Sequence, residues 1–192
     1  MDEEDKSFYY GIILACIIGI AATSIVLIRS VPPQEEFTEL YLHFERIDLT
    51  DNVGQFNGRE VHVSEVIWID IDTDAVQDAE ELFIPGDTFI LDGEFWNISD
   101  VAKDRSQILF GKFPKDVTAG EINFTFVIVN HLGDSHAYTY TVLAGDFTLT
   151  ESVTIKKGER MYVSETISVD SDVKVIVTLD TGEDIYFYLR VS

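Results

Sequence analysis

The chain has 192 residues, of which 35 are acidic and 13 are lysine or arginine, so its formal net charge at pH 7 is −22. Such a surface repels nucleic acid and anionic lipid, which argues against a nucleic-acid-binding protein. The only cysteine is Cys16. A disulfide scaffold is therefore excluded, and the fold must be stabilised by burial of an apolar core.

An uncharged run from Phe8 to Ile28 follows a short acidic tail at residues 1–7. A helix rises about 1.5 Å per residue, so these 21 residues span the roughly 30 Å hydrocarbon core of a bilayer. A cleaved signal has a basic start and a shorter apolar stretch. Lipid attachment at Cys16 would not explain why the apolar run continues beyond it to Ile28. We predict an uncleaved, single-pass transmembrane helix over residues 8–28.

The orientation of this helix is not set by charge, because Lys6 and Arg29 balance each other on its two sides. The acidic tail is too short to act alone, so the functional part follows the helix. Two sequons, beginning at Asn97 and Asn123, could accept glycans only outside the cytoplasm. We predict a cell-membrane protein with a cytoplasmic N-terminus and an extracytoplasmic C-terminal part, with possible glycosylation at both asparagines.

A linker at residues 29–36 contains two prolines and is predicted to be a short, stiff, extended spacer. The segment 37–45, which begins "FTELYLHF", is predicted to be the first strand of a sandwich. The pattern is clearest over residues 118–192, where Ile122, Phe124 and Phe126 begin a period-two alternation typical of a half-buried strand.

Five turn signals divide residues 118–192 into six strands, with no helical stretch between them: "NHLGDS", "AGD", "KKGE", "DSD" and "DTGED". Turns at this spacing are typical of an antiparallel β-sandwich of the immunoglobulin-like type. The predicted fold class is therefore an all-β ectodomain with a β-rich insertion, carried on the single N-terminal transmembrane helix.

Residues 46–117 form this insertion, which is either a small second domain or an elaboration of the sandwich. "REVHVSEVIWIDID" predicts a long strand with a bulge near residues 64–66. "TDAVQDAEELF" predicts a short helix or an acidic loop. Asp92-Gly93 is typical of a two-residue hairpin turn, and "QILFGKF" adds a strand.

At "FTELYL" the chain resembles an archaeal membrane-protein family, domain of unknown function number sixteen-sixteen. The resemblance resumes at "IVNHLGDSHAYTYTV" and "VTIKKGE" and ends at "LDTGEDIYFYLRV", so it covers residues 8–42 and 118–192. It implies a C-terminal sandwich, similar to adhesion-related CARDB domains, outside an archaeal cell. The family usually has several membrane helices and lacks the insertion, and it implies no catalytic residues.

The best candidate site is "DIDTDAVQDAEE", in which five carboxylates occupy positions 1, 3, 5, 9 and 12 of a calcium loop. These are Asp70, Asp72, Asp74, Asp78 and Glu81. Position 6 is Ala75 rather than the glycine of an EF-hand, and the preceding segment is predicted to be a strand. The alternatives are a Ca²⁺ site or a solvated acidic loop.

No nucleophile elbow, phosphate-binding loop or HExxH motif occurs in the sequence, and the four histidines lack metal-ligand spacing. Trp68, Phe95 and Trp96 could line a sugar-binding face, although core packing is favoured. We therefore predict a non-catalytic protein with a structural or binding role at the cell surface. Its partner would be an envelope protein or glycan, and the alternative is a calcium-dependent binding or sensing module in the insertion.

Overall fold

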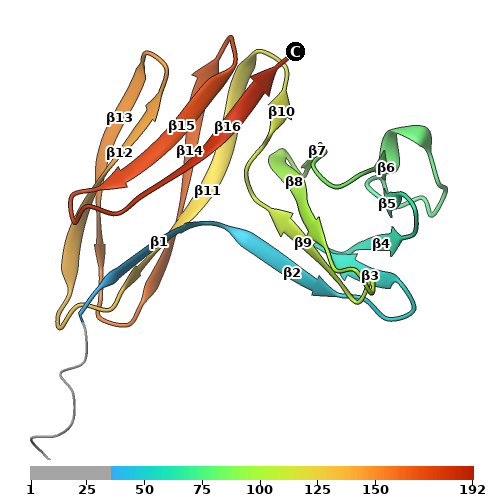
Figure 1. Ribbon diagram of the computed structural model, residues 1–192, viewed down its shortest axis with the longest axis horizontal. Coiled ribbons are helices and arrows are strands. Elements are labelled where there is room, and N and C mark those ends of the chain that lie inside the picture. The colour runs from blue at the N-terminus through green and yellow to red at the C-terminus, as the bar shows by residue number, and fades with distance from the viewer. Residues whose placement is uncertain (1–35) are drawn as a thin grey trace, which may run out of the picture. The chain divides into compact units, whose positions relative to one another are not determined.

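The computed structural model describes residues 36–192, and Phe37 to Ser192 form one compact unit. This unit is built from β-strands and turns, with no α-helix in the described range (Figure 1). The all-β part of the prediction is therefore confirmed. The predicted transmembrane segment, residues 8–28, lies outside the described residues. Within residues 36–192, no helix is long and apolar enough to cross a membrane.

Two sheets enclose the larger core. A three-stranded sheet has the order β1-β11-β14, and a five-stranded sheet has the order β10-β16-β15-β12-β13. All neighbours are antiparallel except the short pair β10–β16. The bounds are β1 (Thr38–Leu42), β10 (Asp116–Val117), β11 (Gly120–Asn130), β12 (His136–Ala144), β13 (Phe147–Ile155), β14 (Arg160–Val169), β15 (Val173–Leu179) and β16 (Asp184–Val191).

Aromatic side chains from the two sheets meet in this core. The ring of Phe126 packs edge-on against Tyr140, with centroids 5.3 Å apart, and the centroid of Phe124 lies 5.1 Å from that of Phe187. The two sheets contribute to one continuous hydrophobic cluster, an arrangement consistent with a β-sandwich (Figure 1).

The six strands predicted between residues 118 and 192 are present, and each turn lies at its sequence signal. The "NHLGDS" turn is held by Asn130, which is fully buried. Its Nδ2 donates to the carbonyls of Asp134 and Ile155, both at 2.8 Å. Its Oδ1 accepts from the hydroxyl of Tyr138, which also lies 3.1 Å from Oγ1 of Thr38 on β1. One asparagine thus ties the turn to the first strand.

β11 differs from the half-buried strand that the alternation predicts, because it is buried on both faces. Val127 and Val129 point away from the aromatic core, yet they are 0% and 5% exposed. Val127 lies in register between Tyr41 of β1 and Tyr162 of β14. Side chains opposite one another on neighbouring strands share a face, so the two larger tyrosines shield the valine from solvent.

The insertion forms two further sheets with a hydrophobic cluster of their own. Their orders are β2-β9-β8-β7 and β3-β4-β5-β6. The bounds are β2 (Phe44–Asp48), β3 (Val53–Phe56), β4 (Arg59–Val63), β5 (Ile67–Ile69), β6 (Leu82–Phe83), β7 (Thr88–Leu91), β8 (Glu94–Val101) and β9 (Gln107–Gly111). Phe56 lies at the centre of this cluster, with its ring centroid 4.1 Å from that of Phe110 and 4.8 Å from that of Trp96.

The long strand predicted over "REVHVSEVIWIDID" is wrong, because this segment folds as a hairpin. Val61 of β4 pairs with Ile69 of β5, and the amide of Ser64 donates to the carbonyl of Val66 in the turn. The slip in the alternation marks a reversal of direction rather than a bulge. The hairpin at Asp92-Gly93 is confirmed: both residues have positive φ, 52° and 80°, as a type I′ turn requires.

The sandwich and the insertion are joined by a closed set of three backbone hydrogen bonds. The amide of His43 donates to Thr125 at 3.0 Å, the amide of Thr125 donates to Lys112 at 2.8 Å, and the amide of Lys112 donates to His43 at 2.9 Å. His43 separates β1 from β2, so it lies where the chain leaves one core for the other.

Asn97 completes the junction next to this set of bonds. It is fully buried, and its Nδ2 donates to the carbonyls of Gly111 and Phe113. A Cβ atom on Gly111 would lie 2.7 Å from this Nδ2, so the close approach requires glycine.

A partly buried polar cluster joins the side chains of β12, β13 and β14, in which Tyr140 is buried, Glu165 is half-buried and Glu151 is exposed. The hydroxyl of Tyr140 lies within hydrogen-bond distance of Glu165 on β14 and, at 3.2 Å, of Glu151 on β13. One hydroxyl proton cannot serve both carboxylates. Burial raises the pKa of Glu165, the bond from Tyr140 opposes this by lowering it, and repulsion from Glu151 raises it further; the net direction is upward.

We expect Glu165 to make the free energy of unfolding depend on pH. A glutamate whose pKa is higher in the folded state contributes stability at low pH, and this contribution is lost as pH rises through the raised pKa. Relative to Glu165→Gln, the unmodified chain should therefore lose stability as pH rises above the ordinary glutamate pKa. Urea denaturation across this pH range measures the difference. Glu121→Gln, at an exposed residue of β11, is the control, and its stability relative to the parent should not follow this trend with pH. A stability difference between the parent and Glu165→Gln that is constant with pH would contradict the raised pKa of Glu165.

Candidate functional site

The acidic segment that follows β5 forms a loop, with one turn of 3₁₀ helix, η1 (Ala79–Glu81), before β6. Of the two predicted alternatives, the loop is therefore the one observed. It is anchored by Glu81, which is 6% exposed. Its Oε2 accepts from Nε1 of Trp68 at 2.8 Å, and its Oε1 accepts from the amides of Ile71 and Asp72 at 2.7 and 3.3 Å. Both oxygens of Glu81 are thus used to close the loop.

Asp70 lies at the start of this loop, and its environment differs from that of the other acids. Its amide donates to the carbonyl of Glu60 at 3.0 Å, which holds the residue beside β4. Its side chain is 7% exposed, and Oδ1 has no hydrogen-bond partner within the described residues. A buried carboxylate without a partner is costly, because it has lost its hydration without compensation.

The carboxylates of Asp72 and Asp74 lie next to Asp70. One oxygen from each of the three residues lies within 4.8 Å of the other two. Oδ1 of Asp72 accepts from the amide of Asp74, and Oδ1 of Asp74 accepts from the amide of Val76. These short-range bonds orient two carboxylates toward the buried one.

The electrostatics of the cluster are unfavourable for three anions. The bond from the amide of Asp74 lowers the pKa of Asp72, but desolvation and repulsion from Asp74, Glu81 and Asp70 outweigh it and leave the pKa raised. A cation among the three carboxylates would relieve this repulsion. Oxygens bound to one Ca²⁺ lie about 2.3–2.6 Å from the ion, so the observed spacing is compatible with shared coordination.

The structure brings together three of the five predicted metal ligands. Asp78 is exposed and precedes η1, and Glu81 uses its oxygens to hold the loop. Ala75, at the position where an EF-hand has glycine, has a φ of 60°, so the sharp turn is made despite the alanine. The donor set fits a hard divalent cation with further oxygens from backbone or water, although the loop is not an EF-hand.

The two sequon asparagines have structural partners. Nδ2 of Asn97 is buried and bonded at the junction, so we expect no glycan on this residue in the folded protein. Asn123 is half-buried. Its Nδ2 donates to the carbonyl of Gly93, and its Oδ1 accepts from the amide of Phe95, which joins β11 to the β7–β8 turn. Glycosylation of Asn123 stays a prediction.

The aromatic residues predicted as a possible sugar-binding face are mainly structural. Trp96 is 1% exposed in the core of the insertion, Phe95 packs against the core of the sandwich, and Trp68 donates to Glu81. The more exposed aromatic side chains include Tyr162, Tyr186 and Tyr188, which sequence reasoning missed. The "YFY" triplet on the last predicted strand was the sequence signal that could have identified Tyr186 and Tyr188.

No family model matches the chain, and a search of curated proteins found no match. The resemblance to the archaeal family therefore stays a prediction.

We expect Glu81→Gln to destabilise the protein, because an amide nitrogen would replace one of the oxygens that accept from Trp68, Ile71 and Asp72. Hydrogen bonds to a charged group contribute about 1.5–3 kcal/mol each, so the loss should be on the order of 2 kcal/mol. Urea denaturation measures it. Glu80→Gln is the matched control, since the neighbouring glutamate is exposed; equal effects of the two substitutions would show that the anchoring role is wrong.

Proposed function

We propose that this chain is a membrane-anchored, extracytoplasmic protein whose immunoglobulin-like β-sandwich has a structural or binding role rather than a catalytic one. The observation that carries the proposal is the compact all-β unit that begins at Phe37, directly after the proline-containing linker. The apolar run at residues 8–28 supplies the anchor. The absence of cysteine after residue 16 means that the fold is independent of an oxidising environment.

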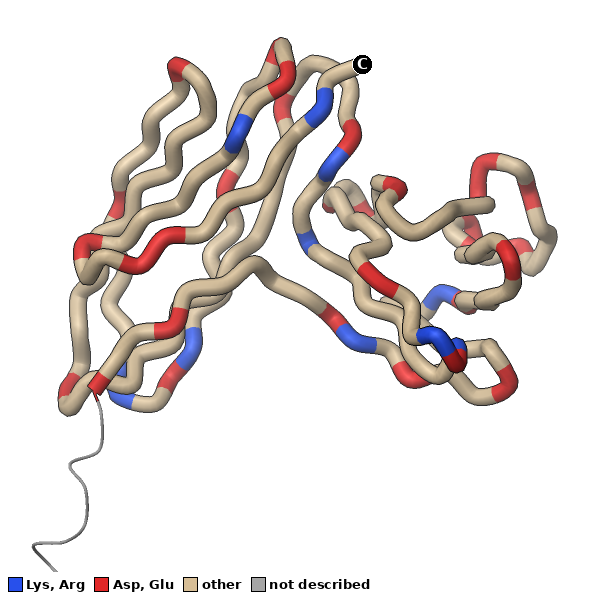
Figure 2. Tube along the Cα trace, viewed as in Figure 1, with Lys and Arg blue, Asp and Glu red and all other residues tan. Residues whose placement is uncertain are grey.

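The charge distribution supports a role in binding at an exterior surface. Acidic residues lie at turns and strand ends throughout the described unit, and basic residues are few (Figure 2). High net negative charge keeps a protein soluble and disfavours contact with nucleic acid and anionic lipid. The resemblance to the archaeal family also supports a place outside the cell membrane.

Protease accessibility tests the anchor and its orientation. We expect the full chain to remain in the membrane fraction after an alkaline wash, because the apolar run spans the bilayer. Protease added to intact cells should remove a C-terminal tag and leave an N-terminal tag intact. Ile17→Arg/Ile20→Arg is the control, since two charges in the run should release the chain. A mature N-terminus after Ile28, or a protected C-terminal tag, would contradict the proposal.

A second candidate function, calcium-dependent binding or sensing by the insertion, is favoured by Asp70. Its buried, unpartnered oxygen lies with two further carboxylates in a cluster of the right size for one cation. Bound Ca²⁺ would supply the missing partner and fix the loop between β5 and β6. The remainder of the insertion would then present this loop to a partner.

We expect millimolar Ca²⁺ to raise the melting temperature of the full chain in detergent relative to the chelated sample. At a hundredfold excess over the dissociation constant the gain is about 2.7 kcal/mol, or a few degrees. Asp70→Asn should abolish the shift. Without Ca²⁺ this variant should melt no lower than the parent, because a buried unpaired charge has been removed. Asp180→Asn, at an exposed turn, should keep the shift. A shift retained by Asp70→Asn would rule out this site.

A further inference from the structure

The strand β13 forms one edge of the five-stranded sheet, and among the described strands it pairs with β12 alone (Figure 1). Its nine residues, Phe147–Ile155, lie in unbroken register with β12, so the strand has no bulge. Edge strands are usually kept short, or carry lysine, proline or a bulge, because free backbone groups attract further strands. The opposite edge of the same sheet, β10, has only two residues. β13 has none of these protections.

The backbone groups that face the open side of β13 belong to alternate residues. Ala144 and Phe147 close a two-residue turn, and the closing pair of such a hairpin exchanges both of its backbone hydrogen bonds. The bonds to β12 therefore come from Phe147 and every second residue after it. The residues between them direct their N–H and C=O groups to the open side: Thr148, Thr150, Ser152 and Thr154. Such a row of donors and acceptors fits an extended polypeptide strand.

The sequence of β13 matches itself when a second copy is laid beside it antiparallel about Glu151. Apolar residues then lie opposite apolar ones, and hydroxyls opposite hydroxyls: Phe147 with Ile155, Leu149 with Val153, Thr148 with Thr154, and Thr150 with Ser152. Aromatic residues opposite β-branched ones, and threonine opposite threonine or serine, are stabilising cross-strand pairs. This register also sets the free backbone groups of one copy opposite those of the other. Three side chains that are only partly buried within one copy would be covered further: Phe147, Leu149 and Val153.

Glu151 is the one charged residue of β13, in a chain of which 25% of the residues are charged. In this register it lies opposite Glu151 of the second copy, in a pair without backbone hydrogen bonds, where Cα atoms are about 4.5 Å apart. Like charges placed opposite one another are destabilising. Within one copy, the groups that face Glu151 are the hydroxyl of Tyr140, at 3.2 Å, and the carboxylate of Glu165. The ion pairs of the described residues do not include Glu151, so its charge opposes the pairing.

We propose that two copies of this chain associate through β13, as antiparallel neighbours in one continuous sheet with Glu151 on the two-fold axis. The free backbone groups would accept a strand of any sequence, and the self-matching order of the side chains favours a second copy. A contact confined to two strand edges is small, so the dimer belongs to the weak, reversible class. The repulsion between the two Glu151 carboxylates weakens it further. This proposal goes beyond the proposed function and rests on neither the membrane anchor nor the calcium loop.

Disulfide crosslinking of the full chain in detergent tests the register. In a Cys16→Ala background, Glu151→Cys should form a covalent dimer under mild oxidation, because a Cα separation of about 4.5 Å is one that a disulfide spans. Thr154→Cys, at an exposed position on the same strand, is the matched control. It would lie about 20 Å from its own copy, six residues along the paired strands, and should stay uncrosslinked. Failure of Glu151→Cys to crosslink, or equally fast crosslinking of Thr154→Cys, would overturn the proposal.

Sedimentation equilibrium of the full chain in detergent at neutral pH tests the role of the charge. Glu151→Gln should strengthen self-association about tenfold, because it removes the repulsion at the axis and keeps the length of the side chain. Glu121→Gln, at an exposed residue of β11, changes the net charge equally and should associate as the parent does. Equal strengthening by both substitutions would assign the effect to net charge, and no change with either would assign association to another surface. Both results contradict the proposal. Unchanged melting temperatures would show that each variant still folds.

Discussion

The structure depends on how the backbone polar groups are satisfied where the chain passes from one hydrophobic core to the other. At His43 the strand β1 ends in the sandwich, and within two residues β2 begins in the insertion. Buried amides and carbonyls left unpaired would cost about 1–3 kcal/mol each. The three backbone bonds among His43, Lys112 and Thr125 satisfy these groups, and Asn97 accounts for the neighbouring carbonyls.

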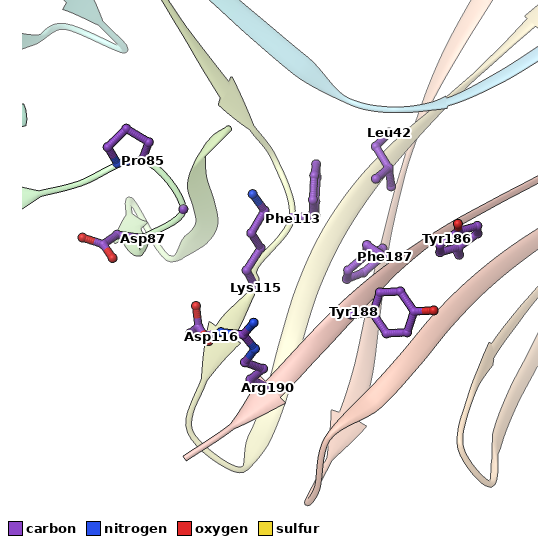
Figure 3. Close-up of a pocket in the computed structure, with 11 residues that line it drawn as sticks. Leu42, Pro85, Asp87, Phe113, Lys115, Asp116, Tyr186, Phe187, Tyr188 and Arg190 are labelled. Carbon is purple, nitrogen blue, oxygen red and sulfur yellow. Dashed lines mark ion pairs between the residues drawn. The ribbon is translucent and has the colours of Figure 1, made fainter. Parts of the chain in front are cut away.

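This junction also determines what surrounds β16. Leu42 and Phe113 come from the two segments that the junction holds, and both line a cavity of about 580 Å³ beside β16 (Figure 3). The ring of Phe113 packs against Phe187 with centroids 5.3 Å apart, and both residues line this cavity. The rings that face outward on β16 remain exposed. The segments that the junction hydrogen bonds hold together thus also form walls of a surface cavity.

Because the chain is so acidic, its sequence alone did not indicate which carboxylates form the candidate metal site. In a chain with 35 acids, a regular spacing of carboxylates is easily obtained by chance, so sequence position alone could not rank them. The burial and hydrogen-bond partners of each carboxylate in the structure distinguish their roles. Glu81 and Asp70 are both nearly inaccessible, yet Glu81 accepts three hydrogen bonds and closes the loop, whereas an oxygen of Asp70 has no partner. The first has a structural role, and the second is left available to a cation.

The sequence by itself determined the strands of the sandwich, because period-two alternation and the glycine- and aspartate-containing turns are local properties of the chain. Asp92-Gly93 was predictable for the same reason, since the turn type follows from two adjacent residues. Partners distant in sequence were not predictable. In the structure, the side-chain amides of the two sequon asparagines hydrogen-bond to the backbone, and the predicted long strand is a hairpin. Tyr186 and Tyr188 are exposed at the surface. Only the tertiary structure decided these outcomes, because burial and hydrogen-bond partners arise when segments far apart along the chain are brought into contact.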